Sequence, residues 1–334
     1  MRESNVVCFF IGMAGSGKTS LISRMSRDLN QKKSSHFIIN LDPASLNNNY
    51  SPNIDIRDTI DYNKVMEEYD LGPNGAIVTS LNLFSTRITQ IKNLIRNNRK
   101  KINYTLIDTP GQIEIFTWSA SGSLITETFS SDFSVSLLYV LDIPRTLSPL
   151  TFITNILYSC SIIYKTKLSS FLILNKKDST SIDFLREWIY DFEAFDFALT
   201  SSDNYSSSFG RSLALILESF NQKIASLGCS AKRTNGTNLI IKHLVKIQKE
   251  FRLVFQKKIE KKLLGNFFLN SNIYNNNSNY ICQSLLQFPS KIQNIKKSSD
   301  NDQTIEKNQY YETLEMLVLF QKESDILHSK NFGI

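Results

Sequence analysis

Residues 12–19, GMAGSGKT, constrain the fold of this chain more than any other stretch. They fill every fixed position of the pattern G-x-x-x-x-G-K-[ST], between an apolar run at 6–11 and a segment with helical spacing. Glycines in this pattern let backbone N–H groups turn inward around a phosphate, which side chains would obstruct. The alternative is a glycine-rich turn without a ligand, but that would need neither the strand before it nor the helix after it. The stretch therefore predicts a strand–loop–helix unit that binds a nucleoside triphosphate.

Several residues of this loop have an expected task. Lys18 would reach the outer phosphates, the Thr19 hydroxyl would coordinate magnesium, and the N-terminus of the helix adds partial positive charge. The predicted nucleotide-binding residues of the loop are Gly12, Gly15, Ser16, Gly17, Lys18, Thr19 and Ser20.

The composition argues against several other classes of protein. The net charge of +7 comes from scattered lysines and arginines without an RNA- or DNA-binding motif, so we expect a solvated surface and no direct nucleic-acid contact. The four cysteines are far apart and the three histidines are dispersed, which argues against a zinc site or a disulfide framework. No stretch approaches the ~20 apolar residues of a membrane span, and the first apolar run leads straight into the phosphate loop. We expect a soluble intracellular protein that makes no membrane contact.

Short apolar segments recur along the chain, at 36–41, 104–107, 135–141, 171–174 and 224–227. Helical spacing between them predicts repeated βαβ units, and such units build a parallel sheet with right-handed crossovers. We therefore predict an α/β P-loop NTPase fold: a mostly parallel sheet flanked by helices, with helical insertions and a C-terminal extension. Ligands of such sheets bind at the carboxyl ends of the strands.

Asp42 follows the second apolar segment, at the end where the ligand is expected. Its carboxylate could coordinate magnesium through water or help to place a nucleophile. Because Pro43 comes next, a helix N-cap or an Asx-turn is the other explanation for this aspartate.

Residues 54–70 have largely helical spacing, which the sequence Gly72–Pro73–Asn74–Gly75 then interrupts. Taken alone, this sequence predicts a surface turn, since proline fixes φ and glycine or asparagine accepts positive φ. The apolar residues beyond it have the spacing of one buried helical face: Leu81, Phe84, Ile88, Ile91 and Ile95.

Residues 108–112, DTPGQ, follow the apolar segment 104–107. An aspartate that ends a buried strand of a P-loop protein supplies the second half of the magnesium site, so the predicted metal residues are Thr19, Asp42 and Asp108. Gly111 lets a backbone N–H approach the terminal phosphate, and Gln112 is placed where a side chain could orient water.

Residues 175–178, NKKD, follow the segment 171–174 and predict guanine recognition. The Asp178 carboxylate can accept the N1–H and the N2 amine of guanine, a pair of donors that adenine lacks, and missing hydrogen bonds would disfavour ATP. Asn175 can tie this loop to the phosphate loop, and the stem of Lys176 can lie along the purine face. A lysine-rich turn is the alternative for this short pattern when it stands alone.

The C-terminal part is predicted in three pieces. After the last apolar segment, Ser230 and Ala231 could present backbone N–H groups to the guanine O6. Residues 237–264 have the pattern of an amphipathic helix with solvated lysines, with a membrane- or partner-binding role as the alternative. We predict that the P-loop domain spans 1–264 and that 265–334 form a low-complexity, largely disordered tail with a short apolar helix near 311–320.

Two stretches closely resemble the GPN-loop GTPases: residues 54–84, which contain LGPNG, and residues 108–128, DTPGQIEIFTWSASGSLITET. Within that family the chain is similar to the eukaryotic subfamily one, the relatives of the XPA-binding GTPase, from about residue 6 to 255. Ala76 stands where the family would have glycine, and Lys177 replaces a threonine or similar residue. What the resemblance implies ends near residue 264, because the tail has no counterpart in it.

The resemblance implies a role for Gly72, Pro73 and Asn74. In this family two subunits pair with facing nucleotide sites, and each GPN loop reaches into the partner's site. Asn74 would there supply polar groups near the terminal phosphate and the attacking water. The resemblance also makes Asp42 and Gln112 candidates for magnesium and water positioning, with Glu114 in a weaker supporting role. GTP or GDP and Mg2+ are the implied ligands.

The same resemblance implies a dimeric switch, as a homodimer or as a heterodimer with a paralogous GPN-loop GTPase. It implies a role in the assembly and nuclear import of RNA polymerase II, with its subunits as partners, and a cytoplasmic location with shuttling to the nucleus. Two other functions stay open: a scaffold that holds GTP without turnover, and a P-loop kinase. A kinase would need an acceptor pocket and lid arginines, and NKKD and DTPGQ argue against it.

Overall fold

The computed structural model describes residues 5–45, 49–98, 101–200, 224–233 and 236–251. All of these residues belong to one unit, Met1–Phe255. The boundary predicted at residue 264, the tail at 265–334 and the apolar helix near 311–320 lie outside the described residues and stay predictions.

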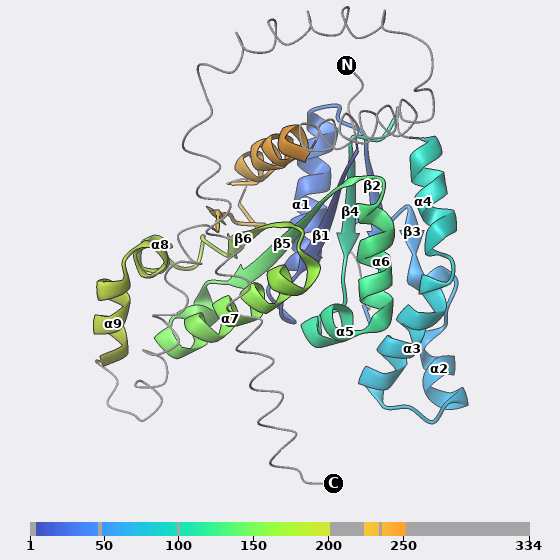
Figure 1. The fold of residues 1–334 in the computed structure, drawn as a ribbon, viewed down its shortest axis with the longest axis horizontal. Helices are drawn as coiled ribbons and strands as arrows, with labels where there is room; N and C mark the ends of the chain where they lie inside the picture. The colour runs from blue at the N-terminus through green and yellow to red at the C-terminus, as the bar shows by residue number, and fades with distance from the viewer. Residues whose placement is uncertain (1–4, 46–48, 99–100, 201–223, 234–235, 252–334) are drawn as a thin grey trace, which may run out of the picture. The chain divides into compact units, whose positions relative to one another are not determined.

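The described strands form one parallel sheet with the order β3-β2-β4-β1-β5-β6-β7 (Figure 1). Their bounds are β1 Val6–Ile11, β2 His36–Asn40, β3 Ile54–Asp55, β4 Tyr104–Asp108, β5 Ser134–Asp142, β6 Ser169–Asn175 and β7 Ser226–Gly228. The predicted α/β fold with a parallel sheet is confirmed. The last strand lies slightly later than its apolar segment, because it pairs with β6 only from Ser226 onward.

Helices connect these strands. Their bounds are α1 Lys18–Gln31, α2 Tyr62–Glu68, α3 Pro73–Ser85, α4 Ile88–Asn97, α5 Ile113–Trp118, α6 Ala120–Ser130, α7 Pro149–Thr166, α8 Asp183–Tyr190 and α9 Phe192–Thr200. Short 3-10 turns occupy Ile56–Asp58 (η1) and Pro144–Thr146 (η2), and residues 237–251 are also helical. Among the described residues, none of the helices has the length and apolar character needed to cross a membrane.

The central strand β1 divides the core into two layers because its side chains alternate between the faces of the sheet. Val6, Cys8 and Phe10 pack with α1 and with the helix at 237–251. Val7 and Phe9 pack on the opposite face, among side chains from α3 to α9. With both faces covered, the strand is buried at every position, which explains its uninterrupted apolar sequence.

The structure corrects the prediction for residues 54–70. Instead of one largely helical segment, they contain β3, η1 and α2. Both residues of β3 pair with the end of β2, so an interaction with a distant strand overrides the local spacing. Asp61 then starts α2, because its side chain accepts the N–H groups of Asn63 and Lys64.

The surface turn predicted at 72–75 is also wrong, since Gly72 is the N-cap of α3 and Pro73 is its first residue. Proline is favoured there because the N–H group that it lacks would have no partner in the helix. The buried apolar face beyond this point is confirmed, although α3 and α4 share it: Leu81, Phe84, Ile88, Ile91 and Ile95 are all buried.

Candidate nucleotide site

The phosphate loop connects β1 to α1 and leaves no room for side chains at two of its glycines. Gly17 has φ 91° at the N-cap of α1, and a Cβ there would lie 2.5 Å from Asn175 Nδ2. A Cβ on Gly12 would lie 2.4 Å from the carbonyl oxygen of Val140. The loop therefore has the compact backbone that its glycine pattern predicted.

Lys18 folds back over this loop. Its Nζ donates to the carbonyl oxygens of Gly12, at 2.7 Å, and Met13, at 3.2 Å. Burial lowers the pKa of Lys18, while the negative charges of Asp108 and Asp42 oppose that shift. A phosphate would give this buried ammonium a charged acceptor in place of two carbonyls.

Two serines of the predicted set differ in their surroundings. Ser16 Oγ is buried and has no hydrogen-bond partner among the described residues. Such an unpaired hydroxyl is costly unless a ligand or water satisfies it, which fits an anion held inside the loop. Ser20 is exposed in the first turn of α1.

Asp108 ends β4 beside the start of α1. Its Oδ2 atom accepts the Thr19 hydroxyl at 2.9 Å and the Tyr50 hydroxyl at 2.8 Å. Its Oδ1 atom is buried without a hydrogen-bond partner in the described part of the chain. Burial raises the pKa of Asp108 to about 6, although the hydrogen bonds from Tyr50 and Thr19 act in the opposite direction. This carboxylate therefore has one oxygen held in place and one left for a further ligand.

Asp42 lies in the loop after β2. Its Oδ1 accepts the backbone N–H of Ala44 at 3.0 Å, so the Asx-turn considered for this residue is present. Burial raises the pKa of Asp42, opposed by hydrogen bonds from the backbone of Ala44 and Gly111 and by the charges of Lys18 and Arg57. The turn and the electrostatic coupling to Lys18 coexist, so the local role does not exclude a ligand-directed one.

The oxygen atoms of Thr19, Asp42 and Asp108 fit a magnesium ion. Mg2+ prefers hard oxygen ligands and is usually held by one or two protein carboxylates together with phosphates and water. The unpaired Oδ1 of Asp108 supplies such an oxygen, next to the hydroxyl of Thr19. Within the described ranges, no group of three or more His, Cys, Asp or Glu residues could hold a metal ion. A bound nucleotide would supply phosphate oxygens as further ligands.

The segment after β4 brings two predicted catalytic residues together. Gln112 Nε2 donates to Asn74 Oδ1 at 2.6 Å, and Asn74 belongs to the first turn of α3 of the same chain. A Cβ on Gly111 would lie 3.3 Å from Ala14 Cβ, so this segment also contacts the phosphate loop. Glu114 is exposed in the first turn of α5. The role of Asn74 in a partner's site stays a prediction.

The loop after β6 is joined directly to the phosphate loop. Asn175, which is 1% exposed, donates from Nδ2 to the Ser16 carbonyl at 2.9 Å and accepts the Ala231 N–H at 3.3 Å. Lys176 Nζ donates to the Gly15 carbonyl at 2.9 Å and pairs with Asp142 at 2.6 Å. The loops after β1, β5, β6 and β7 therefore meet in one place.

Asp178 lies in the same loop after β6, two residues beyond Lys176. Its Oδ1 accepts the Ser230 hydroxyl at 2.5 Å. That hydrogen bond holds the pKa of Asp178 below its usual range, so the side chain is an ionised acceptor at neutral pH. Ser230 thus contacts Asp178 through its side chain, and the backbone role predicted for it stays a prediction.

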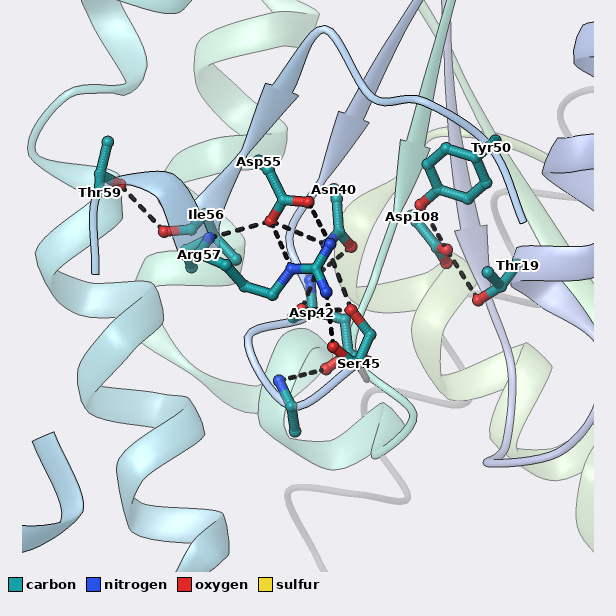
Figure 2. A network of polar contacts seen from close by, with 11 residues as sticks. Thr19, Asn40, Asp42, Ser45, Tyr50, Asp55, Ile56, Arg57, Thr59 and Asp108 are labelled. Carbon is teal, nitrogen blue, oxygen red and sulfur yellow. Dashed lines mark hydrogen bonds and ion pairs between the residues drawn. The ribbon is translucent and has the colours of Figure 1, made fainter. Parts of the chain in front are cut away.

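Sequence patterns missed a second set of residues around Asp42 (Figure 2). Arg57 makes a two-bond fork with Asp55, at 2.9 and 2.6 Å, and donates to the Ser45 carbonyl at 2.7 Å. Asn40, fully buried, donates to Asp55 and to the carbonyl oxygen of Asp42 and accepts the Asp42 N–H. The only local signal was the polar Asn40 at the end of an apolar strand.

Tyr50, which contacts Asp108, was also missed by the sequence analysis. It follows a run of asparagines that carries no recognisable pattern, so only the folded chain reveals its neighbour.

Fold and site together define a P-loop nucleotide-binding protein in which a phosphate loop, a pair of carboxylates and a base loop meet at the carboxyl ends of one parallel sheet. A family model described as a conserved hypothetical ATP binding protein matches residues 10–250. The chain is 45% identical to GPN-loop GTPase 1 of Dictyostelium discoideum over 251 residues, 75% of this chain and 63% of that protein. It is 46% identical to GPN-loop GTPase 1 of Saccharomyces cerevisiae over 273 residues, 79% of this chain and 70% of that protein.

Among solved structures, an apo GTPase from Pyrococcus abyssi matches with a TM-score of 0.64 and 26% identity, covering 74% of this chain and 98% of that one. The chain belongs to the GPN-loop GTPase family, and its similarity to the proteins named GPN-loop GTPase 1 supports the predicted subfamily one. The family model's description refers to ATP, whereas the names of these relatives refer to GTP.

Proposed function

We propose that this chain binds GTP with magnesium and hydrolyses it, acting as a dimeric switch. The observation that carries the proposal is the hydrogen bond from Asn175 to the Ser16 carbonyl, because it joins the base loop to the phosphate loop within one site. Asp178 supports guanine as the base: it is ionised, held by Ser230, and offers two oxygen acceptors to the two donors of guanine. ATP would leave these acceptors without donors.

Positioning and charge explain how these residues would promote hydrolysis. Phosphoryl transfer needs little covalent chemistry from the protein, so donors fixed in advance supply most of the rate. Lys18 would stabilise charge on the outer phosphates, and the Gly111 N–H would approach the terminal phosphate. Gln112, whose amide is already oriented by Asn74, would align the attacking water. Bound at Thr19, Asp108 and Asp42, Mg2+ would supply positive charge to the phosphate oxygens.

The dimer is proposed on the family resemblance together with one feature of this chain. Gly72, Pro73 and Asn74 are exposed at the first turn of α3, where a second subunit can reach them. Because Asn74 also contacts Gln112, closure of two sites against each other would act on the water-positioning residue directly. A homodimer and a heterodimer with a paralogous GPN-loop GTPase both fit this geometry.

The cellular role that we propose follows from the family alone. It comprises assembly and nuclear import of RNA polymerase II, contacts with its subunits, and a cytoplasmic location with shuttling to the nucleus. No direct contact with nucleic acid or with a membrane is part of this proposal. Binding of purified polymerase subunits in the presence of GTP and of GDP would test it, and equal binding in both states would argue against a switch.

Calorimetry with GTP and ATP, followed by analysis of the products formed from labelled GTP, tests the biochemical proposal. We expect a clear preference for GTP and release of free phosphate. Bound GTP without turnover would instead indicate a scaffold, and a labelled acceptor would indicate a kinase. Preference for ATP would overturn the assignment of the base.

A further inference from the structure

Tyr50 makes a contact with the candidate magnesium site that neither the motifs nor the family resemblance assigned. It lies on the connection between β2 and β3, far from Asp108 in sequence. Its hydroxyl donates to Asp108 Oδ2 at 2.8 Å, and Thr19 donates to the same oxygen at 2.9 Å (Figure 2). Two hydroxyl groups from different segments therefore hold one oxygen of this carboxylate.

The position of Tyr50 is fixed from both sides of the residue. Before it, the carbonyl oxygen of Asn49 accepts the Ser23 hydroxyl of α1 at 2.7 Å. After it, Asn53 exchanges hydrogen bonds with the backbone of Ile38 in β2, through its side-chain oxygen and its own N–H, both at 2.8 Å. The Tyr50 ring packs against the core layer that contains α1. The contacts of Asn49 and Asn53 thus hold the segment that presents the Tyr50 hydroxyl to Asp108.

This arrangement determines which oxygen of Asp108 is available to a metal ion. Oδ2 has two donors, whereas Oδ1 is buried and has no hydrogen-bond partner among the described residues. The Thr19 hydroxyl is itself a predicted metal ligand, so its geometry must serve the ion as well as Asp108. Tyr50 is not a predicted metal ligand, so it can keep the Asp108 carboxylate oriented both before and after the ion binds.

We propose that Tyr50 is a positioning residue for magnesium, acting through Asp108. The proposal rests on the proposed function in so far as magnesium accompanies the bound nucleotide. If the hydroxyl merely satisfied its own hydrogen bond, its removal would change stability slightly and leave the dependence on magnesium as it was. If it orients Asp108, removal weakens the response to magnesium specifically.

Tyr50→Phe tests this inference, because phenylalanine keeps the ring and its packing and removes only the donor. The full chain would be titrated with Mg2+ at a fixed concentration of a fluorescent GTP analogue, and also with the analogue in EDTA. We expect the Mg2+ concentration for half-maximal tightening to rise about tenfold, which corresponds to ~1.4 kcal/mol, the lower end for a hydrogen bond to a charged group. Affinity in EDTA should stay within about twofold of the wild type.

Tyr139→Phe is the matched control. Its hydroxyl is likewise hydrogen-bonded to one side-chain oxygen, Asn155 Oδ1 at 3.3 Å, but no hydrogen bond joins it to Asp108. It should leave the magnesium titration unchanged. Ser23→Ala keeps the phenol and frees the carbonyl of Asn49, so it should shift the titration in the same direction as Tyr50→Phe and by less.

An unchanged magnesium titration in folded Tyr50→Phe, with wild-type protein responding normally, overturns this inference and leaves the proposed function intact. Equally weaker binding of the GTP analogue with Mg2+ and in EDTA also overturns it, since that would indicate a general effect on the nucleotide site. A wild-type chain whose GTP affinity does not respond to Mg2+ would overturn both this inference and the magnesium part of the proposed function.

Discussion

Replacing Asn175 with alanine tests whether the base loop and the phosphate loop form one unit. The amide is 1% exposed and makes hydrogen bonds to the Ser16 carbonyl at 2.9 Å and from the Ala231 N–H at 3.3 Å. A neutral hydrogen bond contributes ~1 kcal/mol, and a partner left buried and unpaired costs about 1–3 kcal/mol. Because the 3.3 Å bond is the weaker, we expect a total loss of about 2–3 kcal/mol in the free energy of unfolding.

For a domain of this size, such a loss lowers Tm by roughly 4–12 °C. Thermal melts and urea unfolding would measure it without nucleotide. Calorimetry should show that GTP binds more weakly, because the freed loops must be ordered again when the ligand binds. Asn175→Asp keeps the volume but places a carboxylate oxygen against the Ser16 carbonyl, so it should be at least as damaging.

Asn155→Ala is the matched control for this prediction. Asn155 is also mostly buried, and both atoms of its amide are hydrogen-bonded, to Thr151 and Tyr139, away from the predicted site residues. It should lower stability without changing the affinity for GTP. Wild-type GTP affinity in Asn175→Ala would refute the argument that the two loops act together, whatever happened to Tm.

Three further predictions concern other parts of the site and the fold. Gln112→Leu should lower the rate of single-turnover GTP hydrolysis by about 10²-fold. Asn74→Ala should slow hydrolysis and leave GTP binding intact. Unchanged rates in both variants would contradict the proposed mechanism. Gly17→Ala should abolish GTP binding, because it places a Cβ 2.5 Å from Asn175 at a φ of 91°, and wild-type affinity in a calorimetric titration would contradict this. His243 packs edge-on against Phe171, and burial lowers its pKa. Because the unfolded state then binds more protons, the free energy of unfolding should fall as pH drops through 6.5. His243→Gln should reduce that fall in urea titrations between pH 7 and 5.

The contact between Gln112 and Asn74 changes how the GPN segment can be understood. The resemblance alone placed Asn74 in a partner's site, yet within one chain its oxygen already accepts the Gln112 amide at 2.6 Å. The two roles are compatible if subunit closure exchanges this partner for a group of the other subunit. Hydrolysis measured across a range of protein concentrations would show whether the rate depends on dimer formation.

The network around Arg57 connects the loop carrying Asp42 to β2 and β3. Asn40 bonds to both backbone groups of Asp42, and Arg57 connects Ser45 to Asp55 in the next strand. Burial raises the pKa of Asp55, but hydrogen bonds from Arg57 and Asn40 outweigh it and keep the carboxylate ionised. The cost of burying these polar groups is offset because each has a partner.

The sequence by itself determined which residues form the motifs of the nucleotide site. Lys18, Thr19, Asp108, Asn175 and Asp178 belong to patterns whose physical requirements are local: a glycine turn, a hydrophobic strand and a polar residue where that strand ends. Because the carboxyl ends of parallel strands lie on one edge of a sheet, these patterns also predicted that the loops would converge.

The tertiary structure decided what depends on distant pairing. It made a short strand of Ile54–Asp55, which local spacing assigned to a helix, because β2 offered an unpaired edge. In the folded chain Pro73 is the first residue of α3. Tyr50 donates a hydrogen bond to Asp108, and Arg57 donates one to the Ser45 carbonyl. No periodicity along the chain encodes such contacts, since each depends on how two segments pack after both have formed.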